Sequence, residues 1–345
     1  MIQILQITMD KAYSLWLAAL VVLLHFAPTS VCVQVVSAGN TRDLDAPLAL
    51  KATVFDPERI LPTNWSSSAS VCSWIGITCN TRHQRVAAID LPNMGLIGTI
   101  PPQLGNLSFL VRLNLPNNSL HGRPPPDLSN LRRLRYISLA GNSFSGRLPS
   151  WLGALSELQY LSLGYNKFYG SLSGVFFNAT KLQTILLPNN SITGHIPDEF
   201  SSLENLIGLN LDFNQLTGSL PKSLFNLSSL QKLGVSSNSL SGSLPRDICK
   251  KHVSQLQGLY LSYNQLQGEI PSGIGECSRL QNLPLSYNKF NGSLPKEFWN
   301  LTALERIRLG NTYLEGMLMD WISFKFMIVL CLCVRILSIT KPAQT

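Results

Sequence analysis

The chain has 345 residues, of which 45% are hydrophobic and 13% are charged, and its formal net charge is +8. This length allows two ordinary domains or one long array, and the apolar content is ample for a buried core. No run of Lys and Arg is longer than Lys250-Lys251 or Arg132-Arg133. Such scattered charge argues against a nucleic-acid-binding surface and favours an extracellular one, which would also suit anionic cell-wall material.

Residues 1–37 are predicted to be a secretory signal peptide. Lys11 precedes the apolar run AYSLWLAALVVLLHFAP, and small residues follow near Ser37 and Ala38, where we expect cleavage. The alternative is an uncleaved membrane anchor, but the run is shorter than the roughly 20 residues that a spanning helix needs. We therefore expect an exported chain.

Residues 38–85 are predicted to form an N-terminal cap. The stretch DLDAPLALKATVFDP is expected to be a short helix, with Asp45 as its N-cap and Pro47 in its first turn. Trp65 and Trp74 are expected to pack against the first repeat rather than contact a ligand. The expected apolar face of the helix consists of Leu44, Leu48, Ala52 and Phe55.

The next segment, residues 86–319, repeats one pattern ten times. The pattern is L-x-x-L-x-L-x-x-N-x-L-x-G-x-I-P-x-x-L-x-x-L-x-x, the signature of a leucine-rich-repeat solenoid. Every step is 24 residues except the seventh, which is 26. The units begin at Val86, Leu110, Leu134, Leu158, Leu182, Leu206, Leu230, Leu256, Leu280 and Leu304.

Each conserved position of the pattern has a physical role. The alternating leucines point inward from a short strand, and neighbouring units stack these strands about 4.8 Å apart in a parallel sheet. The Gly permits a bend and the Pro begins the return of the chain. The Asn amide is expected to bond the backbone of its own and the adjacent unit. These residues are Asn118, Asn142, Asn166, Asn190, Asn214, Asn238, Asn264 and Asn288.

The chain contains seven cysteines, and an oxidising compartment would allow some of them to pair. Cys72 and Cys79, in CSWIGITC, are expected to form a disulfide that staples the cap. Cys249 and Cys277 lie at different points of neighbouring repeats. We interpret them as buried free thiols in preference to a second bridge, and their pairing stays open.

The cap and the repeats resemble the extracellular half of plant leucine-rich-repeat receptor kinases, in particular the subgroup that includes innate-immune pattern-recognition receptors. The resemblance lies in DLDAPLALKA, NW, CSWIGITC and LPNMGLIGTIPPQLGNLSFL, and it covers about residues 44–316. The G-x-I-P element is typical of the plant-specific repeat. The resemblance implies a curved right-handed solenoid of 24-residue repeats, with a parallel β-sheet on the concave face and short 3-10 or loop segments on the convex side.

The same resemblance implies a peptide or microbial ligand on the concave or lateral face and a co-receptor kinase with leucine-rich repeats. Three features depart from the family: no kinase domain follows, no second cysteine pair closes the C-terminal end, and the tenth unit decays at GMLMDWISF. Residues 320–345 form a hydrophobic tail outside the repeat. Two interpretations of this tail are a weak membrane anchor and a read-through or truncated gene product, and we favour the second.

Catalytic motifs are missing from the sequence. The five histidines are isolated from one another and from cysteines, and no Walker loop is present. The DFN triplet at 212–214 belongs to the repeat, since Asn214 is its conserved asparagine. We therefore expect no enzymatic activity, no cofactor and no metal site.

The outward positions between the leucines are the candidates for ligand binding. Aromatic residues with polar tips on a rigid sheet suit an extended peptide, whereas the alternative is that Tyr is only a good strand former. Arg306 and Arg308 lie near this set. The candidates are Arg112, Tyr136, Tyr160, Tyr165, Asp212, Phe213, Lys232, Tyr260, Tyr263 and Tyr287.

Eight N-x-[ST] sequons are predicted to carry glycans. Four of them fall 20 positions after a unit start, at a position expected to lie exposed on the return side. Asn117 and Asn189 immediately precede the asparagines of the repeat pattern, so we expect glycosylation at these two sequons less than at the others. The sequons are Asn64, Asn106, Asn117, Asn178, Asn189, Asn226, Asn291 and Asn300.

These observations predict an extracellular, non-catalytic receptor-like protein of plant immune or developmental signalling that binds a peptide or pathogen-derived ligand. One alternative is a secreted inhibitor of pathogen cell-wall-degrading enzymes, resembling the polygalacturonase-inhibiting proteins. Those proteins have a cysteine-closed C-terminus that this chain lacks. The other alternative is a non-functional fragment of a receptor.

Overall fold

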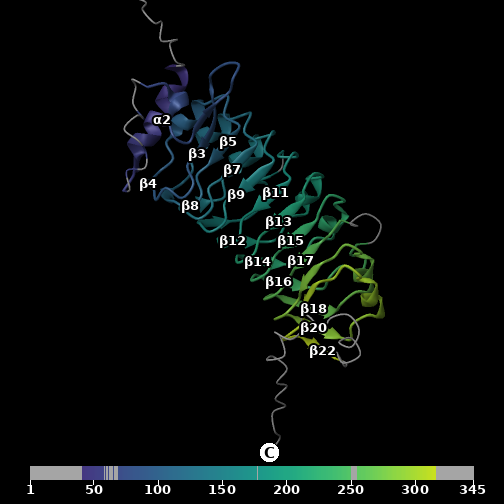
Figure 1. Ribbon diagram of the computed structural model, residues 1–345. Helices are drawn as coiled ribbons and strands as arrows, with labels where there is room; N and C mark the ends of the chain where they lie inside the picture. The colour runs from purple at the N-terminus through teal and green to yellow at the C-terminus, as the bar shows by residue number, and fades with distance from the viewer. Residues whose placement is uncertain are drawn as a thin grey trace, which may run out of the picture. The chain divides into compact units, whose positions relative to one another are not determined.

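The repeats predicted from the sequence form a solenoid of parallel strands stacked in two sheets (Figure 1). The predicted signal peptide, the Asn64 sequon and the predicted tail lie outside the described residues. No helix in the described part is both long and apolar enough to cross a membrane. The computed structural model describes residues 41–57, 59, 61, 65, 69–176, 178–249 and 255–315.

The first sheet, called sheet 1, is built from the L-x-L segments of the repeat. Its strands pair in parallel with equivalent residues one unit apart, as Leu113 pairs with Ile137 and Ile137 with Leu161. Only β2 is antiparallel, and it covers the edge of β3 at the N-terminal end. The strands are β2 (Ile77–Cys79), β3 (Val86–Asp90), β5 (Arg112–Asn114), β7 (Tyr136–Ser138), β9 (Tyr160–Ser162), β11 (Thr184–Leu186), β13 (Gly208–Asn210), β15 (Lys232–Gly234), β17 (Gly258–Tyr260), β19 (Asn282–Pro284) and β21 (Arg306–Arg308).

A second sheet, called sheet 2, was not predicted. It is built from the x-L-x-G segments, which carry one apolar residue each and are too short to show an alternating pattern. Most of its strands end at the repeat glycine in a left-handed conformation, for example φ 82° at Gly194, as the predicted bend requires. The strands are β1 (Val54–Phe55), β4 (Ile97–Gly98), β6 (Ser119–Gly122), β8 (Ser143–Arg147), β10 (Lys167–Gly170), β12 (Ser191–Gly194), β14 (Gln215–Gly218), β16 (Ser239–Gly242), β18 (Gln265–Glu269), β20 (Lys289–Gly292) and β22 (Tyr313–Leu314).

Short 3-10 helices carry most of the return segments, as predicted. Each begins directly after a proline with an extended conformation, such as Pro101 before the first of them. The described return segments of two units contain no such helix: the fourth, where Ser173 stands at the position of the repeat Pro, and the seventh, where Pro245 is followed by turns. Besides η1 (Val71–Ser73) in the cap, the helices are η2 (Pro102–Asn106), η3 (Pro126–Asn130), η4 (Ser150–Ala154), η5 (Asp198–Ser202), η6 (Lys222–Asn226), η7 (Ser272–Glu276) and η8 (Lys296–Asn300).

The conserved asparagines hold neighbouring units together, and this prediction is confirmed. Asn214 shows the arrangement: its Nδ2 donates to the carbonyls of Leu187, Leu211 and Asp212 at 3.0, 3.1 and 3.2 Å. Its Oδ1 accepts a hydrogen bond from the backbone N–H of Ile192 at 3.0 Å. Because Leu187 and Ile192 belong to the preceding unit, one amide satisfies the backbone of two units.

The cap helix α2 (Thr41–Thr53) differs from the prediction. It begins before Asp45, which lies exposed inside the helix and is not the N-cap. Leu44 and Leu48 are half-buried and pack against the core, as predicted. Ala52 is exposed, and Phe55 is 65% exposed and belongs to β1, so this half of the predicted apolar face was wrong. The most deeply buried residues of the helix are Asp43, Ala46, Pro47 and Leu50.

Asp43 explains why α2 turns this face inward. Its carboxylate is fully buried and accepts hydrogen bonds from the Arg85 guanidinium at 2.6 and 2.9 Å and from the Val86 N–H at 2.8 Å. A buried carboxylate with three such donors is satisfied, and it fixes the helix against the first strand. A sequence pattern based on apolar residues misses a buried face centred on a charge.

The rest of the cap follows the prediction. Trp65 and Trp74 are buried, with ring centroids 5.1 Å apart in a stacked arrangement, which supports their packing role. Cys72 and Cys79 form a disulfide beside them.

The interpretation of Cys249 and Cys277 as free thiols was wrong, because the structure joins them in a second disulfide. The unequal register of the two cysteines in the repeat does not keep them apart. Cys249 has a φ of 65°, so the chain turns there and leaves the regular return path before the two-residue insertion. This turn brings its Cα to 5.2 Å from that of Cys277, in the next unit.

The asparagine ladder yields a stability prediction. Asn214→Ala leaves several buried backbone groups without partners and is expected to lower the free energy of unfolding by about 2–4 kcal/mol. Urea unfolding followed by circular dichroism, together with hydrogen exchange at the Ile192 amide, measures this loss. The matched control is Asn205→Ala, which removes one exposed hydrogen bond to the Thr180 carbonyl and is expected to change little. Equal losses in the two variants would contradict a special role of the ladder.

The second disulfide yields another stability prediction. It closes a loop of 28 residues, so Cys249→Ala with Cys277→Ala is expected to lower stability by about 3–4 kcal/mol. Limited proteolysis should then cut first between units seven and eight, where the crosslink is lost. Reducing the wild-type protein should reproduce this cleavage pattern, and an unchanged pattern would show that the crosslink does not hold these units together.

Candidate functional site

Three predicted ligand-binding residues form one stack on the outer face of sheet 1. The Arg112 guanidinium lies 3.7 Å from the ring centroid of Tyr136, and the rings of Tyr136 and Tyr160 stack at 4.4 Å. Asp90 pairs with Arg112 at 3.2 Å. The residues meet because β3, β5, β7 and β9 pair in register, so that residues about one unit apart become neighbours.

This stack presents ring edges and hydroxyl groups instead of open ring faces. Tyr136 is covered by Arg112 on one face and by Tyr160 on the other, since these residues come from the units on its two sides. Burial raises the pKa of Tyr160, and the neighbouring Tyr136 raises it further. The Tyr160 hydroxyl therefore acts as a neutral hydrogen-bonding group at physiological pH.

A second set of predicted residues lies outside the strands, directly before the repeat position of the ladder asparagine, which is Met94 in the first unit and Thr312 in the last. This position has φ between 53° and 65° in every unit. Asn and Gly tolerate this left-handed conformation, whereas bulky side chains adopt it at a cost of roughly 1–2 kcal/mol. The column is Asn93, Asn117, Gly141, Tyr165, Asn189, Phe213, Ser237, Tyr263, Tyr287 and Asn311.

Four members of this column form what we call the aromatic ridge: Tyr165, Phe213, Tyr263 and Tyr287. They are 59%, 58%, 53% and 43% exposed, so burial does not compensate their strained backbone. Strand propensity does not account for them either, because they lie in bends after the strands. Bulky exposed residues in a disfavoured conformation are typical of functional positions.

The last two ridge residues contact each other directly. The rings of Tyr263 and Tyr287 stack at 4.2 Å with an interplanar angle of 11°. The hydrogen bond with Tyr287 raises the pKa of Tyr263, while the nearby Arg308 acts in the opposite direction. A continuous aromatic surface thus runs across two units.

Asp212 lies directly beside the ridge residue Phe213. Its carboxylate accepts a hydrogen bond from the Ser236 N–H at 2.6 Å. Burial raises the pKa of Asp212 to about 6, and the hydrogen bonds from Ser236 and Asn210 only partly oppose this shift. The carboxylate fits because residue 234 is Gly, where a Cβ would approach a carboxylate oxygen to 3.0 Å.

Two predicted residues do not join either aromatic group. Lys232, on β15, is exposed and forms no ion pair within the described part of the chain. Tyr260 is half-buried and lies over Gly258, where a Cβ would come within 2.6 Å of its ring. The sequence did not reveal Asp90 as the partner of Arg112, although both lie on outward positions of adjacent units.

The seven described sequon asparagines are all exposed, which leaves their glycosylation as a prediction. Asn106, Asn226 and Asn300 are the last residues of η2, η6 and η8. Asn117 and Asn189 belong to the left-handed column, and Asn117 already donates a hydrogen bond to the Asn93 side chain at 2.9 Å.

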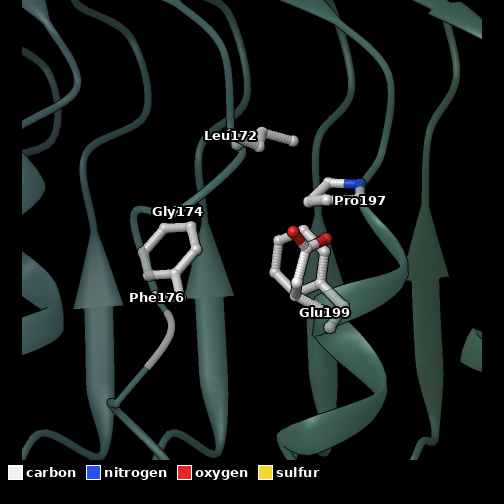
Figure 2. A pocket seen from close by; sticks show the side chains of 6 residues that line it. Leu172, Gly174, Phe176, Pro197 and Glu199 are labelled. Atoms are coloured by element: carbon white, nitrogen blue, oxygen red, sulfur yellow. The ribbon is translucent and has the colours of Figure 1, made fainter.

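A hollow on the return side is lined mainly by apolar residues. It lies between the fourth and fifth units, where Ser173 replaces the repeat proline, and Figure 2 shows Phe176 and Glu199 on opposite sides of it. Glu199 is the one titratable side chain among its lining residues. Across the described residues, no group of three His, Cys, Asp or Glu side chains is placed to hold a metal ion. The lining consists of Leu172, Gly174, Phe176, Pro197, Glu199 and Phe200.

Comparisons with known protein families agree with this architecture. The leucine-rich-repeat N-terminal domain model matches residues 40–80, and one leucine-rich-repeat model matches residues 180–240. A second repeat model matches residues 109–131, 133–155, 255–277 and 279–301.

Among curated relatives, the LRR receptor-like serine/threonine-protein kinase EFR of Arabidopsis thaliana is 37% identical over 108 residues. That alignment covers 31% of this chain and 10% of EFR, and the chain spans no more than about a tenth of the first receptor kinases it matches.

Two solved structures are similar over longer stretches. The plant peptide hormone receptor RGFR1 in complex with RGF2 is 37% identical with a TM-score of 0.60, over 63% of this chain and 34% of the receptor. A plant ice-binding protein is 26% identical with a TM-score of 0.64, over 81% of this chain and 96% of that protein.

The repeat period, the asparagine ladder, the disulfide-stapled cap and these similarities agree with one another. The chain is a leucine-rich-repeat protein of the plant type, and its relatives are plant LRR receptor kinases and their ectodomains.

Proposed function

We propose that the chain is the ligand-binding part of an extracellular plant receptor-like protein and that it recognises an extended peptide along the aromatic ridge beside sheet 1. The aromatic ridge carries this proposal. Its exposed rings are held in a strained conformation on a rigid array, which suits anchor positions for a ligand. The similarity to a peptide hormone receptor supports a peptide as the ligand class.

The spacing of the ridge gives the proposed ligand a periodicity. Tyr165, Phe213 and Tyr263 are two units apart in sequence, which corresponds to about 10 Å along the sheet. An extended peptide rises about 3.4 Å per residue, so roughly every third residue would meet a ring. A linear peptide with apolar side chains at this interval fits the ridge better than a compact domain does.

The remaining features of the proposal follow from the resemblance to receptor kinases. The role lies in immune or developmental signalling, the location is the apoplast or the plasma membrane, and a co-receptor kinase with leucine-rich repeats is the expected signalling partner. The ligand is a plant or pathogen-derived peptide. The alternative of an enzyme inhibitor is tested by incubating the protein with fungal pectinases, where dose-dependent inhibition would favour it.

Ice binding is a second candidate function, favoured by one observation on sheet 2. Hydroxyl and amide side chains recur there at equivalent positions of parallel strands, as in Ser191, Thr193, Thr217, Ser239 and Ser241. Charged Lys167 on β10 and Lys289 on β20 interrupt these columns. An ice-recrystallisation assay on the purified chain tests this function, which the interruptions lead us to rank second.

The ridge yields a prediction with two opposite effects. Phe213→Asn relieves the left-handed strain and is expected to raise the free energy of unfolding by about 1 kcal/mol. The same change is expected to weaken binding by about tenfold for peptides selected on the wild-type protein from a display library of short linear peptides. Calorimetry measures the binding and urea unfolding the stability.

Tyr169→Ala is the matched control for this variant. Tyr169 is an aromatic residue on β10 of sheet 2, 41% exposed, outside the left-handed column. Its removal is expected to leave peptide affinity unchanged. If both variants bind the selected peptides as tightly as the wild type does, the ridge is not the ligand site.

Asp212 yields a prediction of pH dependence. Its carboxyl group holds a proton more tightly in the folded chain, where its pKa is about 6, than in the unfolded chain, where it is near 3.8. Stability is therefore expected to fall as the pH rises from about 4 to about 6. Urea unfolding across this range is expected to show that Asp212→Asn flattens the dependence and that the exposed control Glu305→Gln does not. A wild-type slope retained in Asp212→Asn would contradict the assignment.

A further inference from the structure

A cluster of arginines lies apart from the proposed peptide site, beside the N-terminal ends of β3 and β7. We call it the basic flank, and it consists of Arg82, Arg85, Arg132, Arg133 and Arg135. Arg82, Arg132, Arg133 and Arg135 are exposed. The sequence shows only two short basic segments here, 50 residues apart, and the stacking of the units brings them to the same edge of the solenoid.

Two of these arginines are held in place by one aromatic ring. The guanidinium carbons of Arg85 and Arg133 lie 4.8 and 4.2 Å from the ring centroid of Phe109. The three residues occupy the same repeat position in consecutive units, so the two guanidinium groups lie on opposite faces of the ring. Stacking on a ring leaves the in-plane N–H groups of Arg133 directed outward and already oriented.

Little negative charge compensates this cluster. Asp43 is fully buried and engaged by Arg85, and Asp90 is paired with Arg112. Glu157 is paired with Lys181, with Arg135 as a further positive neighbour that helps to lower its pKa. Within the described ranges, Arg82, Arg132, Arg133 and Arg135 form no ion pair. Four exposed arginines without an ion pair in the described part of the chain therefore lie along one edge of the solenoid.

The surroundings of the basic flank distinguish two kinds of anionic partner. A protein partner needs an apolar or aromatic centre in its interface, whereas the ring of Phe109 is already contacted by the guanidinium groups of Arg85 and Arg133 and by the His83 ring at 5.4 Å. The neighbouring side chains are instead the hydroxyl and amide groups of Ser108, Ser156 and Gln159. A hydrated polymer with regularly placed carboxylates would use both the planar guanidinium groups and these polar neighbours.

We propose that the basic flank binds a carboxylate-bearing polysaccharide, with Arg133 and Arg135 as the principal contacts. This site is separate from the aromatic ridge, so a chain that binds no peptide would still bind the polymer. Binding anchors the protein to an anionic matrix through several weak contacts, each sensitive to salt.

The test uses the full chain and polygalacturonate as the probe, with fully methyl-esterified polygalacturonate as the uncharged polymer of the same backbone. The wild-type protein is expected to bind the acidic polymer at low salt, with affinity falling steeply as salt rises, and to bind the ester at least about tenfold more weakly. The double variant Arg133→Gln with Arg135→Gln is expected to lose about fivefold to tenfold in affinity for the acidic polymer.

The matched control is Arg246→Gln with Arg279→Gln, which removes the same charge from exposed positions four or more units away. It is expected to keep wild-type affinity, and thermal unfolding checks that both double variants remain folded. Equal loss in the two double variants would overturn the proposal, because attraction would then follow net charge alone. Equal affinity for the methyl ester, or equal affinity for poly-glutamate, would overturn the assignment to an acidic polysaccharide.

Discussion

The structure depends on one interaction, the set of hydrogen bonds that each ladder asparagine makes to the backbone of two units. A single 24-residue unit cannot bury its leucines, so every unit relies on its neighbours. The asparagine fixes the distance and register between them, because its amide bonds carbonyls on both sides and its oxygen accepts an N–H of the preceding unit. This repeated contact keeps the equivalent strands and 3-10 helices of successive units in register.

The ladder also creates the proposed binding surface. To direct its amide inward, each asparagine follows a residue in the left-handed conformation, and the side chain of that residue is turned outward. The fold thus provides one exposed position per unit at which Asn and Gly are the least costly residues. Four positions carry aromatic residues instead: Tyr165, Phe213, Tyr263 and Tyr287. These residues lower the stability of the fold, and they form the surface that is most suited to a ligand.

The period of the sequence was enough to predict the units, the inward leucines and the ladder, because each follows from contacts that repeat. The role of the cap tryptophans could be predicted from their place directly before the first unit. It was not enough where a contact is unique. The buried face of α2 depends on Asp43 meeting Arg85, and the Cys249–Cys277 disulfide depends on a turn at an irregular step. The outward residues were identified, but their grouping into a stack and a ridge required the register of the strands and the backbone angles after them.

The left-handed column has one further consequence for how the surface is exposed to its surroundings. Asn189 carries a sequon and stands in the unit between those of Tyr165 and Phe213. A sugar chain attached there would separate Tyr165 from the other three rings and shield the middle of the row. Attachment occurs in the secretory pathway, so the producing cell, and not the folded protein, would decide whether a ligand meets four rings or three.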